Sequence, residues 1–110
     1  MSSQDTMAYA QTEAENAKII RQQIEKNQAD ITAMQHDSKA SEMQSDIQTK
    51  FQVNEGLERK YQEHMSNYER LQQEALSLQK REQEERLQEQ QKNQDGIKKT
   101  VKEVVKSTLF

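Results

Sequence analysis

Apolar residues recur along this chain in two stripes, at alternating spacings of three and four. The first stripe runs from Ala10 to Met34 and the second from Ala40 to Leu78. This spacing is typical of the face along which one helix packs against another. The chain has no proline and only two glycines, so little in the sequence interrupts such helices. The pattern predicts an all-α protein built from long helices.

A polar segment separates the two stripes, and the heptad register does not cross it. We call the packing face of each helix its seam. Extending the register of the first stripe places the next seam position on Ser38, two residues before Ala40. Coiled coils absorb insertions of three or four residues by local rewinding, but not of two. We therefore predict a turn over 36–41, between a helix at about 6–35 and a second helix at about 42–94.

Folding the second helix back on the first brings complementary positions together. Small residues of the first stripe then lie opposite large residues of the second. Among the polar seam positions, Asn27 falls near Lys50 and Glu13 falls near His64. We therefore predict an elongated antiparallel helical hairpin of the coiled-coil type, with a single bent helix as the alternative.

A different pattern follows the second stripe. The run from Asn93 to Gly96 contains turn-forming residues and predicts a helix stop. Beyond it, residues 97–110 predict a short C-terminal amphipathic helix, with four lysines outside its apolar face. Three interpretations of this helix stay open: it docks on a protein groove, it lies on an anionic membrane surface, or it packs on the hairpin or frays.

Composition supports an extended coiled coil rather than a compact core. Only 31% of the 110 residues are hydrophobic, 32% are charged, and the formal net charge is −3. These values favour one coiled-coil domain over residues 1–110 and argue against nucleic acid as a partner. Cysteine is absent, which is compatible with a reducing compartment.

No motif of catalysis or cofactor binding is present in the sequence. The only two histidines, His36 and His64, have no metal-ligand spacing, and there is no Gly-rich phosphate loop. The carboxylates are distributed along predicted helix faces rather than gathered for acid–base chemistry. We therefore expect no enzymatic activity, no catalytic residues, no cofactor, no metal and no small-molecule substrate.

The N-terminal residues lack the basic and apolar regions of a signal peptide, and no apolar run reaches membrane-spanning length. We therefore expect a cytoplasmic protein, with export by a route that needs no signal peptide as the alternative.

Candidate partner-binding residues lie on the second stripe and on the C-terminal helix. Phe51 and Met65 flank the second stripe and widen it, which indicates contact with a third helix. Lys50, Asn54 and His64 interrupt the seam, either to specify a partner or as tolerated polar positions. The full set of candidates is Phe51, Leu57, Tyr61, Met65, Tyr68, Leu71, Leu78, Ile97, Val101, Val104, Val105 and Leu109.

These features favour a non-catalytic structural or adaptor subunit that binds helices of other proteins or of its own copies. The alternative is a small helical chaperone or targeting factor that holds a helical cargo for a secretion apparatus or a membrane. Stable self-assembly without cargo would favour the first function. A basic C-terminal segment needed for delivery but not for cargo binding would favour the second.

Overall fold

Two long helices form almost the entire protein. The computed structural model describes residues 1–109, with Leu109 described by its backbone alone and Phe110 outside the described residues. Helix α1 covers Ser3–Gln35, the short 3-10 helix η1 covers Ala40–Met43, and helix α2 covers Gln44–Leu109. Over the described residues every element is helical, so the expectation of an all-α protein is confirmed.

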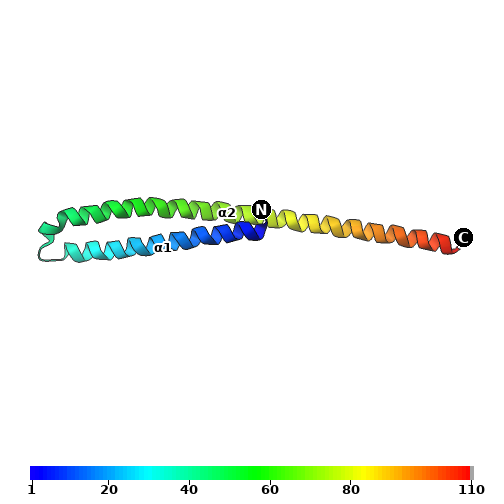
Figure 1. The fold of residues 1–110 in the computed structure, drawn as a ribbon, viewed down its shortest axis with the longest axis horizontal. Helices are drawn as coiled ribbons and strands as arrows, with labels where there is room; N and C mark the ends of the chain where they lie inside the picture. The colour runs from blue at the N-terminus through cyan, green and yellow to red at the C-terminus, as the bar shows by residue number, and fades with distance from the viewer. Residues whose placement is uncertain (110) are drawn as a thin grey trace.

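The molecule is a thin rod (Figure 1). Its principal extents are 104 × 15 × 13 Å, and its radius of gyration is 28.9 Å. A compact domain of this length would have a radius of gyration of about 13 Å. The 66 residues of α2 at about 1.5 Å each account for nearly the whole length of the rod.

Helix α1 lies beside the first part of α2 and runs in the opposite direction (Figure 1). At one end of this contact, Ser3 hydrogen-bonds to Glu82. Towards the other end, Lys50 pairs with Asp30. We refer to residues 3–82, where the two helices lie together, as the paired segment. Residues 83–109 of α2, which have no second helix beside them, are called the arm.

The start of α1 differs from the expected position near residue 6. Ser2 is the N-cap, and its side chain accepts a hydrogen bond from the backbone N–H of Asp5. Ser2 also accepts two hydrogen bonds at its backbone carbonyl, from the N–H and the hydroxyl of Thr6. Several polar residues near the N-terminus are good N-caps, so the sequence did not distinguish among them.

The turn lies close to its predicted place at 36–41. His36 caps the end of α1, and the Asp37 carboxylate accepts a hydrogen bond from the N–H of Lys39 at 2.8 Å. The 3-10 helix η1 then leads into α2, which begins at Gln44 rather than at residue 42. A short 3-10 turn of this kind is common at the end of an α-helix.

Burial follows the three-four pattern on both helices. On α1 every position from Ser3 to Met34 in the alternating series is buried or half-buried, and the same holds on α2 as far as Glu82. The most deeply buried apolar residues are mostly small, which allows the two helices to approach closely: Ala10, Ala17, Ile31, Ile47 and Ala75. Burial of a side chain such as Ile31 stabilises the fold by about 1.5–3 kcal/mol.

The predicted stop between residues 93 and 96 is wrong. Helix α2 passes through it without a break, so the expected boundary between a helix at 42–94 and another at 97–110 does not exist. A glycine ends a helix when it adopts a left-handed conformation, and neither glycine has a positive φ. Gly96 instead stays helical, and its carbonyl accepts a hydrogen bond from the Thr100 hydroxyl.

The apolar face of the arm does not continue the seam of the paired segment. If the seam register is extended beyond Glu82, its positions fall on polar residues and Gly96. At 3.6 residues per turn, Ile97, Val101 and Val104 point roughly a quarter turn away from the seam. The arm therefore carries a second, separate apolar face.

Candidate functional site

A buried layer of amides lies in the middle of the paired segment. Asn27 is 6% exposed, and its Nδ2 donates a hydrogen bond of 2.9 Å to Asn54 Oδ1. Gln23 donates to Asn27 Oδ1 at 3.0 Å, and Asn54 Nδ2 donates to the carbonyl of Ile24 at 3.3 Å. We expected Asn27 near Lys50, one turn earlier on α2. Paired amides satisfy each other in a buried position, whereas Lys50 reaches the Asp30 carboxylate at 3.4 Å.

The predicted contact between Glu13 and His64 is confirmed. His64 Nδ1 and Glu13 Oε2 are hydrogen-bonded across the two helices, and both side chains are about a quarter exposed. This contact gives the histidine a structural partner within the same chain. It accounts for a polar residue at a seam position without a bound ion.

Arg21 forms a second cross-helix contact that the sequence analysis did not identify. Its guanidinium donates to Glu58 at 3.1 Å and lies 4.1 Å from the centre of the Tyr61 ring. The hydrogen bond that Arg21 donates to Glu58 is the main reason that the pKa of Arg21 is raised. Arginine reaches across such a seam from a flanking position, so the three-four apolar pattern does not reveal it.

Glu82 binds the first turn of α1 at the end of the paired segment. Its two carboxylate oxygens accept hydrogen bonds from the backbone N–H of Ser3 at 2.8 Å and from the Ser3 hydroxyl at 2.9 Å. The backbone N–H of Ser3, followed by its hydroxyl, holds the pKa of Glu82 below its usual range. A carboxylate is favoured there because the N-terminus of a helix carries unpaired N–H groups and positive partial charge.

The candidate partner-binding residues of the second stripe fall into two groups. Five occupy seam positions of α2 and are half-buried, so α1 already covers part of each: Leu57, Tyr61, Tyr68, Leu71 and Leu78. Phe51 and Met65 flank the seam, and Phe51 is exposed. Met65 and Tyr61 line a shallow groove with Ala14, Ala17 and Arg21 of α1. The structure thus brings Tyr61 and Met65 together in this groove, whereas Phe51 does not line it.

The candidate residues of the arm all lie on one exposed helix. Ile97, Val101, Val104 and Val105 are between 49% and 63% exposed. The side chain of the remaining candidate, Leu109, lies outside the described residues. Every side-chain hydrogen bond identified from residue 83 to residue 108 stays within α2. Among the residues that the structure describes, then, none covers this apolar face.

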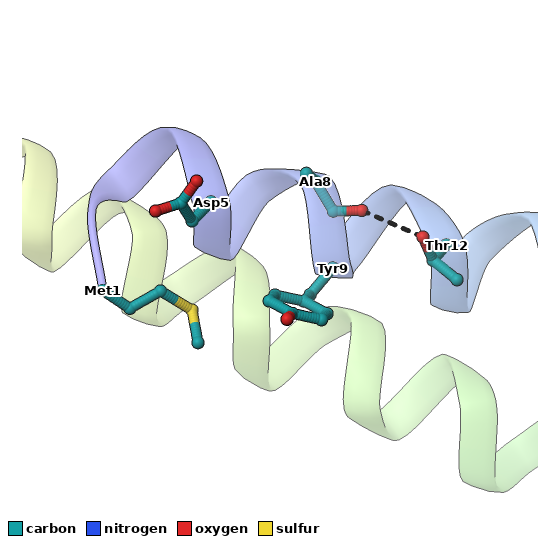
Figure 2. Close-up of a pocket in the computed structure, with 5 residues that line it drawn as sticks. All are labelled: Met1, Asp5, Ala8, Tyr9 and Thr12. Carbon is teal, nitrogen blue, oxygen red and sulfur yellow. Dashed lines mark hydrogen bonds between the residues drawn. The ribbon is translucent and has the colours of Figure 1, made fainter.

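One surface hollow lies along a single face of α1. It is lined by Met1 and by the first turns of α1, and Figure 2 shows Met1 ahead of the helix and Asp5, Ala8, Tyr9 and Thr12 following one another along it. In it the Thr12 hydroxyl donates to the carbonyl of Ala8 at 3.2 Å, and Asp5 is the one acidic residue of its lining. General acid–base chemistry needs converging groups in an enclosed site. A single helix face does not provide them.

Among residues 1–109 there is no group of three or more histidine, aspartate or glutamate side chains placed to hold a metal ion. Neither α1 nor α2, over the same residues, contains a stretch long and apolar enough to cross a bilayer.

The sequence analysis missed two exposed leucines that extend the apolar face of the arm. Leu76 and Leu87 are 56% and 65% exposed. Both fall in a three-four series with Ile97, Val101 and Val104, once this series is counted separately from the seam. The predicted stop at Gly96 hid the relationship because it divided the series into two elements.

Comparison with protein-family models, with curated protein sequences and with solved structures finds no match to this chain. The fold itself defines the class of the protein, which is elongated, all-helical and built from two long helices.

Proposed function

We propose that this protein is a non-catalytic structural or adaptor subunit that works by binding other helices. In this proposal residues 3–82 form a helical hairpin of the coiled-coil type that fixes the shape of the molecule. The arm is the main binding element, and the widened stripe around Phe51 and Met65 is a second contact for a partner helix.

The observation that carries this proposal is the exposed apolar face of the arm. Four aliphatic side chains, from Ile97 to Val105, are exposed on the part of α2 that lies beyond α1. Burial of each against a partner would contribute about 1.5–3 kcal/mol before the costs of ordering. Exposed apolar faces of this kind mark binding surfaces on many proteins.

A double substitution on the arm tests the proposal. The full chain and a Val101→Asp/Val104→Asp variant would be used to capture helical proteins from an extract of the source cells. We expect the variant to lose the captured proteins while the melting temperature of the paired segment stays the same. A Lys99→Gln/Lys106→Gln variant is the matched control, because it changes the net charge equally but leaves the apolar face intact.

The experiment has two contrary outcomes. If the aspartate variant retains every protein captured by the wild type, the arm is not the binding element. If the same variant unfolds the whole protein, its apolar face belongs to the core of the fold. Either result would overturn the proposed function.

A small helical chaperone or targeting factor is the alternative. Its support is the basic character of residues 97–109 of the arm, where Lys98, Lys99, Lys102 and Lys106 are all exposed. Such a factor would hold cargo at the paired segment and present the arm to a secretion apparatus or to a membrane surface. Replacement of the four lysines by glutamine would then stop delivery but preserve cargo binding. Loss of both activities together would contradict this alternative.

A further inference from the structure

The arm has two halves of opposite charge. Between residues 83 and 95 there are four acidic and two basic side chains. Between residues 97 and 109 there are four lysines and one glutamate. A second arm laid antiparallel can therefore bring lysines of its basic half beside carboxylates in the acidic half of the first. A parallel arm would place halves of like charge together, which is unfavourable.

We propose that the arm pairs antiparallel with the arm of a second copy of this chain. This inference rests on the proposed function, because it names the partner helix for the same apolar face. The face is free to receive it, since it points away from the seam that α1 covers. It extends over an exposed three-four series that includes Leu76, Leu87, Ile97, Val101 and Val104.

One register brings apolar positions and opposite charges together near the twofold axis, whereas Val101 and Val104 then lie opposite Gln83 and Lys80 of the second copy. Placing Leu87 of one arm against Ile97 of the second copy creates two equivalent apolar layers around a twofold axis. The same register puts Gln90 against Gln94 of the second copy, where the two amides can hydrogen-bond. It also puts Glu84 beside Lys98 of the second copy, at the positions that flank the contact. Each of these contacts occurs twice in the dimer.

The pairing predicts a longer particle as well as a heavier one. The chain has a mass of 12.9 kDa and a length of 104 Å. In the proposed register the two copies overlap over about 33 residues, or about 50 Å of helix. An antiparallel dimer would therefore be about 160 Å long. A parallel dimer would double the mass without increasing the length.

Light scattering and small-angle X-ray scattering on the full chain test the pairing. We expect twice the monomer mass and a maximum dimension of about 160 Å. A Leu87→Asp/Ile97→Asp variant should be a monomer with an unchanged melting temperature of the paired segment. A Lys99→Gln/Lys106→Gln variant should remain a dimer, because those lysines lie on the far face of the arm.

Charge exchange tests the direction of the arms. The variants Glu84→Lys and Lys98→Glu each create two like-charged contacts per dimer, so each alone should weaken dimerisation roughly tenfold. Mixed in equal amounts, they should restore it, because every contact then joins opposite charges. A Glu84→Lys/Lys98→Glu variant should likewise dimerise as the wild type does.

Several results would overturn this inference. The first is a wild-type chain that stays monomeric at every concentration tested. The second is a dimer no longer than the monomer, and the third is a mixture of the two charge variants that does not recover dimerisation. A monomer that instead sediments with vesicles of anionic phospholipid would also overturn it and would assign the arm to a membrane surface. The proposed function is judged separately by capture of other helical proteins, so failure of self-pairing does not by itself remove it.

Discussion

Asn27 and Asn54 hydrogen-bond to each other between α1 and α2 at 2.9 Å, in a part of the seam where Asn27 is almost fully buried. The pair is also bonded at both sides, to Gln23 and to the carbonyl of Ile24. A buried polar group without a partner costs about 1–3 kcal/mol. Any shift of α1 along α2 would separate the two amides, so this layer selects one register.

Removal of one amide should be more damaging than removal of both. We expect Asn54→Leu to lower the free energy of unfolding by about 1–3 kcal/mol, because the buried Nδ2 of Asn27 then loses its acceptor. The Asn27→Leu/Asn54→Leu double variant should recover stability or exceed the wild type, since it buries two apolar side chains. Urea denaturation followed by circular dichroism measures both effects. A single variant as stable as the double would show that the amide pair has no energetic role.

The sequence predicted the pattern of contacts better than the exact partners. Alternating spacings fix which face of each helix is buried, and this is why Ala17, Ile31 and Ile47 were placed correctly. Glu13 and His64 were also paired correctly. The partner of Asn27 was displaced by one turn, because a hydrophobic pattern repeats along the helix and distinguishes neighbouring turns only weakly.

The other errors concern groups whose role depends on a distant part of the chain. Glu82 lies in a polar stretch, and nothing in its neighbours indicates that it binds the start of α1. Asp95 and Gly96 have the composition of a turn, yet long flanking runs of good helix formers keep them helical. The local sequence does not show whether a turn or a continuous helix is lower in free energy at Asp95 and Gly96.

Loss of the Glu82 carboxylate should loosen the start of α1. In a Glu82→Ala variant, the amides of the first turn of α1 should exchange hydrogen faster than in the wild type, because Ser3 loses two acceptors. Hydrogen exchange measured by mass spectrometry would locate the change. Glu85→Ala is the matched control, since Glu85 is an exposed carboxylate on the same helix. Equal exchange in both variants would contradict the assignment.

The same contact should depend on pH in a defined direction. The pKa of Glu82 is lowered in the folded protein, chiefly by the backbone N–H of Ser3. Its stabilising contribution is therefore complete above the unfolded pKa of about 4.3 and is lost as the pH falls through the lower folded value. The difference in first-turn exchange between wild type and Glu82→Ala should stay constant near neutral pH and shrink in acid. A difference that grows on acidification would refute this account.

Disulfide crosslinking should test the antiparallel register directly. Ile20 and Tyr61 lie one heptad away from the Asn27–Asn54 layer, in opposite directions along the two helices. Cysteines introduced at these two positions should form a disulfide within one chain, since the natural sequence has no cysteine to compete. Cysteines at Ile19 and Val53, both exposed on outer faces, should not. Electrophoresis without reductant would measure both, and links formed only between chains would indicate a swapped arrangement.

The two glycines of α2 should respond differently to substitution by alanine. A Cβ atom at Gly56 would meet only the Arg59 side chain at 3.8 Å, and one at Gly96 would meet nothing within 4 Å. Alanine is more stable than glycine inside a helix by about 1 kcal/mol, so neither change should introduce strain. Gly56 lies within the paired segment, where unfolding is shared by α1 and α2. Gly96 lies in the arm, which contributes no contacts to that segment.

We therefore expect Gly56→Ala to raise the melting temperature by roughly 4–8 °C, the shift that about 1 kcal/mol produces in a domain of this size. Gly96→Ala should increase helicity at 25 °C but leave the main transition almost unchanged. Circular dichroism measures both quantities on the same samples. If Gly96→Ala instead lowered the helical signal, the arm would need a break at this position, and the continuous helix from Gln44 to Leu109 would be wrong. A main transition raised by Gly96→Ala as much as by Gly56→Ala would show that the arm unfolds together with the paired segment.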